Sequence, residues 1–330
     1  MTTIHTLRTG RRQILKLATA GVASLLSIPA VHAADFPDRP IKIIVNFPPG
    51  GPLDIIARSV AARLTTTLKQ PVFVENVSGA SGNIGAMAVA RAQPDGLTIL
   101  FSLDTPFTMT PLLTPDANFR PNELRTVSLM AVTASAVVAN PSLGVQSMAE
   151  LVEKGRREII TFATAGSGSP GHFAALLFAE ATGAKVNPIH YRGNAPAVLA
   201  VVSGEVQAGI LGTGGVAPHV KAGKLKGLAL AGTQRSALLP DVPTTKEAGY
   251  PDLELQFMFL AMVSAKTPDA QFKALNAAIS EALRQPDIQQ RLLTIDASTV
   301  ALDERQAIER LDKARVKYAK VVKESGMKAE

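Results

Sequence analysis

The feature that most constrains the fold is a regular alternation of short β-rich runs with longer helical patterns. IKIIVNF at 41–47 precedes the amphipathic run DIIARSVAARLTTTL at 54–68, and PVFVENV at 71–77 precedes NIGAMAVARA at 83–92. Such alternation is typical of parallel strands with helices packed on the faces of the sheet. The sequence therefore predicts an α/β fold with a mostly parallel sheet.

The alternation starts again near residue 135, at SAVVAN, and continues to about residue 232. After LELQFMFLAMVSA at 253–265, we expect only helices, over 271–285, 286–295 and 303–325. Two separate α/β units in a chain of this length predict two lobes, because a single core rarely serves so many residues.

The helical C-terminal segment suggests that the first lobe is interrupted by the second. We place the crossings near 130–133 and near Gln256, so that 34–132 together with 256–330 form one lobe and 133–255 form the other. This arrangement leaves a cleft between the lobes, where ligands commonly bind. Two continuous domains in tandem are the alternative.

The first 33 residues have the layout of a bacterial export signal. Arg11 and Arg12 precede an apolar segment at 17–28, which is followed by small residues ending at Ala33. The paired arginines indicate the twin-arginine route. An apolar segment of about 12 residues is too short for a membrane anchor, which needs roughly 20. We predict cleavage after Ala33 and a mature protein in the periplasm.

Composition excludes several classes of site. The chain has no cysteine, which excludes disulfides, thiolate metal sites, cysteine nucleophiles and a lipidated cysteine at the cleavage site. The mature protein should therefore be soluble and not lipid-anchored. The formal charge is +7, but residues 1–33 contribute four basic and no acidic residues, so +3 remains after cleavage. With few aromatic residues and no basic cluster, nucleic-acid binding is not expected.

The loop NFPPGGPLD at 46–54 joins the first predicted strand to the first predicted helix. It lacks the Gly-Lys-Ser/Thr ending of a nucleotide P-loop, and the chain has no GxGxxG motif. Pro49, Gly50 and Gly51 would instead present backbone N–H groups at a helix N-terminus, where a small anion is favoured. Asp54 is expected to cap the helix; the alternative is that it orients the loop or meets a ligand.

A second loop of this kind, ATAGSGSPGH at 163–172, follows another predicted strand. Ser169 is expected to be the N-cap of the next helix, with Gly166, Ser167 and Gly168 facing outward. Open α/β sheets bind ligands at the carboxyl ends of their strands, so two such loops from separate lobes predict one site between them. SGASGN at 78–83 is a third, weaker candidate loop.

The sequence gives no support for catalysis. AGSGS at 165–169 lacks both outer glycines of the G-x-S-x-G elbow. Ser102 and Asp104 follow a predicted strand, but no histidine is obviously available to either. We predict no enzyme activity, no metal and no cofactor.

The histidines of the mature chain have spacings that match no helical metal pair; they are His172, His190 and His219. His172 lies in a predicted first helical turn and could face a ligand. A periplasmic hydrolase that uses Ser167, Ser169 or His172 is a remote alternative.

Several long stretches of the sequence match motifs of one known family, and they occur in the same order as in that family. FPDRPIKIIVNFPPGGPLDIIAR, FATAGSGSPGHFAALLF, HYRGNAPAVLAVVSGEVQAGI and RSALLPDVPTTKEAGYPDLE are among them, and together the matches cover nearly all of 36–265. The chain thus resembles the Bug family, the periplasmic solute-binding receptors of tripartite tricarboxylate transporters.

The resemblance implies a two-lobed periplasmic binding fold of the Venus-flytrap type that closes on a small carboxylate. The ligand would be held by backbone amides and ordered waters. The ligand-binding residues that we carry forward are Pro49, Gly50, Gly51, Asp54, Ser81, Asn83, Ser102, Asp104, Ala165, Gly166, Ser167, Gly168, Ser169 and His172.

Two departures from the family pattern bear on the ligand. Leu53 stands where the family often has a threonine, so one hydroxyl donor is missing. Gly212-Thr213-Gly214-Gly215 stands where an Asp-containing loop is frequent. We hypothesise that losing this acidic group disfavours ligands with an amine and favours plain carboxylates.

The resulting functional prediction is a monomeric receptor that delivers an organic carboxylate to the membrane permease subunits of a tripartite tricarboxylate transporter. Ligand contacts with both lobes would select a closed state by hinge closure. The alternative with the same fold is a ligand-sensing periplasmic subunit that signals to a sensor kinase.

Overall fold

The computed structural model describes residues 36–113, 120–167 and 169–325. The predicted export signal at 1–33 lies outside these ranges. Residues 37–330 form one compact unit, which is the part described below. Within the described ranges, no helix is both long and apolar enough to cross a membrane.

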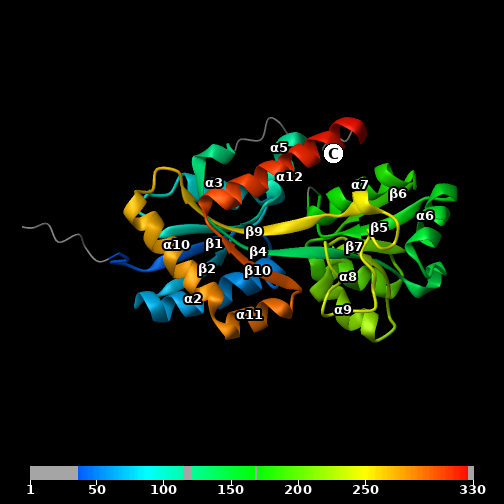
Figure 1. Cartoon of the computed structure of the whole chain (residues 1–330), viewed down its shortest axis with the longest axis horizontal. Helices are drawn as coiled ribbons and strands as arrows, with labels where there is room; N and C mark the ends of the chain where they lie inside the picture. Colours follow the sequence, from blue (N-terminus) through cyan, green and yellow to red (C-terminus); the bar gives the residue numbers. More distant parts are fainter. Residues whose placement is uncertain (1–35, 114–119, 168, 326–330) are drawn as a thin grey trace, which may run out of the picture. The chain divides into compact units, whose positions relative to one another are not determined.

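The described part of the chain contains a continuous ten-stranded sheet (Figure 1). Its strands are β1 (Ile41–Val45), β2 (Val72–Asn76), β3 (Thr98–Leu103), β4 (Leu124–Ala139), β5 (Ile160–Thr164), β6 (Val186–His190), β7 (Ala208–Gly212), β8 (Lys226–Leu230), β9 (Gln256–Ser264) and β10 (Ala297–Leu302). The order is β2-β1-β3-β9-β4-β7-β5-β6, with β8 and β10 each paired to β4.

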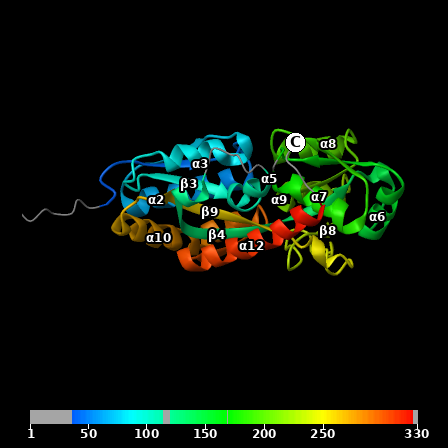
Figure 2. The same cartoon turned by 90° about the horizontal axis from the view of Figure 1, so that it is seen from above.

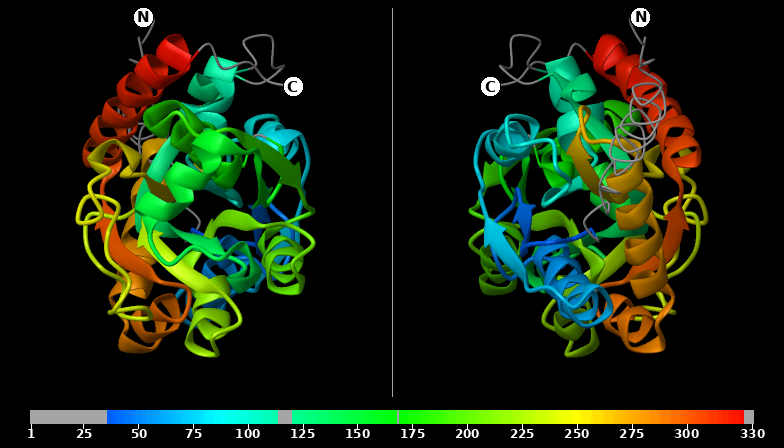
Figure 3. Two further views of the ribbon diagram at one scale, coloured as in Figure 1. Left: turned by 90° about the vertical axis from the view of Figure 1, so that its right-hand side faces the viewer. Right: turned by 90° about the vertical axis from the view of Figure 1, so that its left-hand side faces the viewer.

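Helices cover both faces of these strands, as the views in Figure 3 show. The α-helices are α2 (Pro52–Leu68), α3 (Asn83–Ala90), α4 (Thr105–Thr108), α5 (Thr110–Leu113), α6 (Met148–Arg157), α7 (Pro170–Thr182), α8 (Asn194–Ser203), α9 (Thr213–Lys221), α10 (Asp269–Arg284), α11 (Pro286–Leu293) and α12 (Glu304–Ser325). Short 3-10 turns are η1 (Ala80–Gly82), η2 (Pro121–Glu123), η3 (Pro141–Leu143) and η4 (Pro251–Leu253).

The long strand β4 belongs to both halves of the sheet. Its residues 124–134 pair with β9, and its residues 135–139 pair with β7 and β8. The outer pairs β1–β2, β1–β3, β5–β6 and β5–β7 are parallel, whereas β4 and β9 run antiparallel to their neighbours. The fold is thus a two-lobed α/β architecture with a mixed sheet, parallel only towards its edges.

Most of the predicted elements are present within a few residues of their expected ends. The helix predicted over 166–183 begins only at Pro170, because the residues before it form the loop at the end of β5. The short helices α4 and α5, the first half of β4, α9 and β10 were not predicted. The helix α9 contains two glycines and Pro218, which hide its helical pattern, and β10 interrupts the segment expected to be helical throughout.

The C-terminal helix α12 contacts both halves of the molecule (Figure 2). Arg315 donates from Nε to the carbonyl oxygen of Phe107 at 2.9 Å, which ties α12 to α4. Three residues later, Tyr318 is buried and packs edge-on against Phe173 of α7, with ring centroids 5.0 Å apart. An aromatic pair of this geometry adds about 1 kcal/mol of stability beyond its buried area. Through these contacts with α4 and α7, α12 connects the two lobes, as the strands β4 and β9 also do.

Candidate ligand-binding site

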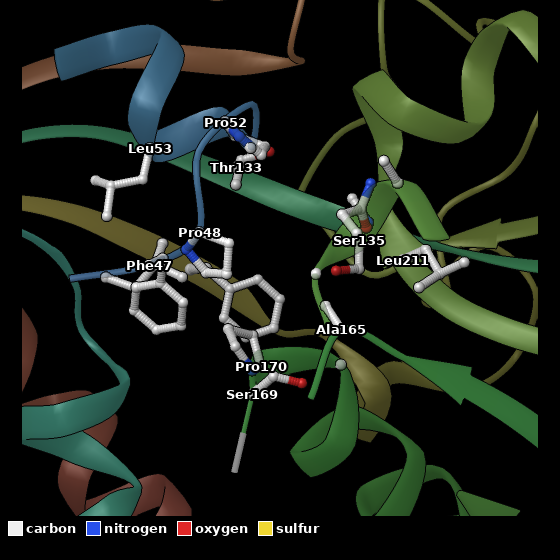
Figure 4. Close-up of a pocket in the computed structure, with 18 of the residues that line it drawn as sticks. Phe47, Pro48, Pro52, Leu53, Thr133, Ser135, Ala165, Ser169, Pro170 and Leu211 are labelled. Atoms are coloured by element: carbon white, nitrogen blue, oxygen red, sulfur yellow. The ribbon is translucent and has the colours of Figure 1, made fainter. Parts of the chain in front are cut away.

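A cavity of about 200 Å³ lies between the two lobes, where the loops after several strands meet (Figure 4). Its lining residues are Phe47, Pro48, Pro49, Gly50, Gly51, Pro52, Leu53, Leu103, Thr133, Ala134, Ser135, Ala165, Ser169, Pro170, Gly171, Arg192, Gly193, Asn194, Ala195, Pro196, Ile210, Leu211, Gly212, Phe257 and Phe259. In Figure 4, Pro48 from one lobe faces Ala165 from the other.

Four helices begin at this cavity. The residue just before the first turn of each one lines it: Gly51 before α2, Ser169 before α7, Gly193 before α8 and Gly212 before α9. The first amides of an α-helix have no partner inside the helix, and the helix dipole adds partial positive charge there. Four such ends around one cavity favour an anion.

The loop before α2 is held by Asp54, which does not itself line the cavity. The Asp54 carboxylate accepts hydrogen bonds from the Gly50 amide at 3.1 Å, Arg58 Nε at 3.0 Å and Asn76 Nδ2 at 3.0 Å. Burial alone would raise the pKa of Asp54, but these hydrogen bonds outweigh it and lower that pKa. Asp54 thus accepts a free backbone N–H just before α2, and through this bond it also orients the loop, which was the alternative role.

The loop before α7 is partly as expected. Ser169 is the N-cap, since its Oγ accepts from the His172 amide at 3.3 Å, and Pro170 is the first helical residue. Ala165 and Ser169 line the cavity, whereas Gly166 and Ser167 do not. Gly168 lies outside the described residues.

Ser81 and Ser167 instead join the two loops to each other. Ser81 has a φ of 54°, and its Oγ donates to the carbonyl oxygen of Ser167 at 3.1 Å. Neither side chain lines the cavity. This bond joins the loop after β2 to the loop after β5.

Three further predicted site residues also lie outside the cavity lining. Ser102 is fully buried, where its Oγ accepts from Asn46 Nδ2 at 2.8 Å and donates to the Leu103 carbonyl at 2.6 Å. Asn83 is buried in the first turn of α3. His172 is buried, with its ring 4.5 Å edge-on from that of His190. All three are buried, and none is among the described residues that line the cavity.

Asp104 is fully buried at the end of β3 and supports the strand β9. Its Oδ1 accepts from the Met258 amide at 3.0 Å and its Oδ2 from Thr108 Oγ1 at 3.1 Å. Burial raises the pKa of Asp104 to about 6, although these hydrogen bonds oppose the rise. Asp104 is not a lining residue; it holds the start of α4 against the strand that carries Phe257 and Phe259.

Asp104→Asn should change how stability depends on pH. A carboxyl with a raised pKa binds its proton more tightly in the folded state, so wild-type stability falls as pH rises from about 4 through about 6. The fall should be on the order of 2 kcal/mol. Asparagine keeps an acceptor for the Met258 amide and a donor for the Thr108 hydroxyl but does not titrate. The fall of the unfolding free energy with rising pH that Asp104 causes should therefore vanish in the variant. Urea unfolding at pH 4.5 and 7.5 measures it; an unchanged slope in the variant would contradict the assignment.

The loop 192–196 contributes lining residues that the sequence reasoning did not select. Arg192 is exposed and is the one charged side chain among the described lining residues. Asn194 accepts from the Gly212 amide through Oδ1 at 3.0 Å, which joins the starts of α8 and α9. HYRGNAPA has the same strand–loop–helix pattern as the two loops that were chosen, so this signal was present in the sequence.

The strand residues of the lining could not be found from the sequence. Leu103 pairs in register with Phe259, and Thr133 pairs with Phe257, so β3, β9 and β4 form a continuous wall. These residues are far apart in the chain, and only the pairing of the strands brings them together.

The glycine-rich stretch after β7 is the start of a helix and not a free loop. Gly212 ends β7 and lines the cavity, while Thr213 begins α9 and donates from Oγ1 to the Ala134 carbonyl at 3.0 Å. Among the described residues, no acidic side chain lines the cavity and no group of three metal-ligating side chains occurs.

Known proteins resemble this chain over nearly its whole length. A family model described as "Tripartite tricarboxylate transporter family receptor" matches residues 56–327. Protein BugT of Bordetella pertussis is 35% identical over 316 residues, which cover 94% of this chain and 95% of that protein. A protein of Agrobacterium vitis is 31% identical over 316 residues, covering 94% and 91%.

Solved structures show the same fold. A Rhodopseudomonas palustris protein with adipate has a TM-score of 0.84 at 27% identity, covering 89% of this chain and 99% of that one. MatC from Rhodopseudomonas palustris with bound malate has a TM-score of 0.77 at 27% identity, covering 88% and 100%. The periplasmic binding protein BugD has a TM-score of 0.82 at 29% identity, covering 89% and 100%.

Proposed function

Because the chain belongs to the family of tripartite tricarboxylate transporter receptors, we propose that it is an exported receptor that captures a small organic carboxylate between its lobes. The observation that carries this proposal is the convergence of four helix N-termini and Arg192 on a cavity whose described lining has no acidic side chain. Two related proteins, solved with adipate and with malate, support a carboxylate ligand.

The proposed mechanism is closure of the two lobes on the ligand. The lobes are 34–132 with 256–330 and 133–255, and β4 and β9 cross between them. A ligand that contacts Gly51 on one side and Ser169 on the other stabilises the closed state, because only that state lets it reach both helix ends. The bond from Ser81 to Ser167 joins a residue of each of these lobes.

The role is one of binding and delivery, with no chemical step. Ser169 is occupied as a helix cap, and His172 is packed against His190. The receptor would act as a monomer in the periplasm and hand its ligand to the permease subunits of a tripartite tricarboxylate transporter. A cavity without an acidic side chain among its described lining residues also supports a preference for acids that carry no amine.

The test begins with native mass spectrometry of protein freshly isolated from the periplasm, which detects a co-purified ligand. A melting-shift panel of mono-, di- and tricarboxylates follows. At about 100 times its Kd, a ligand that binds only the folded state should add about 2.7 kcal/mol of stability. If no acid raised the melting temperature, the carboxylate proposal would fail.

Arg192→Gln should weaken binding of every carboxylate that the protein accepts. Removing a charge-assisted hydrogen bond costs roughly 1.5–3 kcal/mol, which corresponds to a rise in Kd of roughly 10- to 150-fold. Titration calorimetry of wild type and variant measures it. Arg157→Gln on α6 is the control, because Arg157 is an exposed arginine paired with Glu153 and does not line the cavity. Equal losses in both variants would exclude a specific role for Arg192.

A further inference from the structure

The geometry points to a ligand with a single carboxylate on an apolar body, and to a site that binds a second carboxylate poorly. This inference rests on the proposed function and specifies the ligand class of the same cavity. It follows from where charge, hydrogen-bond donors and apolar side chains lie in the lining.

The positive groups of the lining can balance the charge of one anionic group of the ligand. Arg192 is the one cationic side chain among the described lining residues, and the other positive potential comes from helix ends. The residues that precede those helices, Gly51, Ser169, Gly193 and Gly212, all line the same cavity. A carboxylate needs several charge-assisted bonds to offset its loss of water, and the loops supply them at one place.

The strand wall of the cavity is apolar. Leu103, Phe257 and Phe259 line it, and the two phenylalanines are 3% and 1% exposed. Phe257 and Phe259 are two residues apart on β9, so their side chains leave the same face of the strand. Leu103 pairs in register with Phe259, which makes the apolar surface continuous.

The first loop extends this apolar surface. Leu53 is 3% exposed, and both Leu53 and Phe47 line the cavity. From the other lobe, Ile210 and Leu211 of β7 line it as well. The apolar side chains of this surface thus come from β3, β9 and the loop after β1, because Ile210 and Leu211 are neighbours on β7 and leave opposite faces of the strand.

Two threonine hydroxyls near this wall are engaged, whereas the side chains of Ser135 and Asn194 add neutral polar groups to the lining. Thr133 Oγ1 donates to the Asp296 carbonyl at 3.0 Å, and Thr213 Oγ1 donates to the Ala134 carbonyl at 3.0 Å. A second carboxylate placed against the wall would therefore lose water without gaining a cation, because the described lining has no cationic side chain besides Arg192. Such burial of an uncompensated charge is strongly unfavourable.

The volume of the cavity limits the size of the ligand. Its volume of about 200 Å³ lies below the ~300–1,000 Å³ of sites for drug-sized ligands. Only a small acid fits a cavity of this volume. Short branched or aromatic monocarboxylates meet this limit, and they place their apolar part against Phe257 and Phe259.

The experiment compares hexanoate with adipate, which share a six-carbon chain and differ in whether the far end is a methyl or a carboxylate. Titration calorimetry uses the mature protein freed of any co-purified ligand, and phenylacetate, malate and citrate complete the panel. We expect the Kd of hexanoate to be lower than that of adipate by at least about tenfold. Equal or tighter binding of adipate, malate or citrate would overturn this inference and leave the proposed function intact. If no acid bound, both would fail.

Leu53→Asn tests the apolar wall directly. It replaces the isobutyl group with an amide of similar size, so the preference for hexanoate over adipate should shrink by about fivefold. The ratio of the two Kd values in one sample does not depend on the fraction of folded protein. Leu199→Asn on α8 is the matched control, because Leu199 is 59% exposed and does not line the cavity. An unchanged ratio in Leu53→Asn would contradict the inference.

Discussion

Gly171→Ala is expected to destabilise the protein by about 3 kcal/mol and to weaken ligand binding. A Cβ atom at this position would lie 2.6 Å from the backbone oxygen of Ile210, closer than real Cβ atoms come to any such atom. In an unconstrained helix, the same change would stabilise by up to about 1 kcal/mol. Here α7 must move away from β7, and overpacking of this kind costs about 1–3 kcal/mol or more. Because Gly171 lines the cavity, the displacement also moves the Ser169 end of the site.

Gly51→Ala provides the matched control for this substitution. Gly51 also lines the cavity and precedes a helix, but the nearest atom to its added Cβ would be the Pro48 oxygen at 3.7 Å, an ordinary contact. We expect a loss below about 1 kcal/mol, which reflects only the poorer N-cap. Urea unfolding compares the two variants. Equal losses for Gly171→Ala and Gly51→Ala would show that the close approach of α7 to β7 is unimportant.

Asp54→Ala is expected to cost about 3 kcal/mol of stability at neutral pH and to abolish measurable ligand binding. The change removes a buried carboxylate and leaves the Gly50 amide and the Asn76 side chain without their acceptor. Hydrogen bonds to a charged group contribute about 1.5–3 kcal/mol each, and their losses overlap because they share one acceptor. Without Asp54, the loop 46–52 loses the contact that aims it at the cavity.

The loss of stability caused by Asp54→Ala should become smaller as the pH is lowered. The pKa of Asp54 is lowered in the folded state, so its stabilising contribution is present above the ordinary value of 3.8 and is lost as pH falls through the folded value. The difference in unfolding free energy between wild type and Asp54→Ala should therefore shrink below about pH 4. Urea titrations at pH 7 and pH 3 measure this, together with calorimetry of the ligand at pH 7.

The control for Asp54→Ala is Glu153→Ala. Glu153 accepts from Arg157 at 2.6 Å on the surface of α6, in an exposed ion pair one helical turn apart. Such pairs contribute a few tenths of a kcal/mol, so this variant should unfold almost as the wild type does. A similar small loss for Asp54→Ala would mean that the loop before α2 is held by its prolines rather than by the carboxylate.

The loops before α2 and α7 show which parts of the site could be predicted from local sequence patterns. Gly51 and Ser169 could be placed at helix starts because strand, glycine turn and helix follow one another along the chain, and both line the cavity. Ser102 near the end of β3 and Asp104 just after it were chosen by the same reasoning, yet both are fully buried and neither lines the cavity. The side of a strand or loop that a residue faces depends on what packs there, and that is a property of the tertiary structure.

The sequence by itself determined the α/β class, the two-lobed fold and the two loops that begin α2 and α7, because these depend on periodicity and on turn residues that are local in the chain. The tertiary structure alone decided that Asp54 holds the Gly50 loop and that Leu103, Phe257 and Phe259 form the apolar wall. It also decided that α8 and α9 begin at the same cavity. These arrangements arise when β4 and β9 cross between the lobes and pair strands distant in sequence, and no local pattern encodes that register.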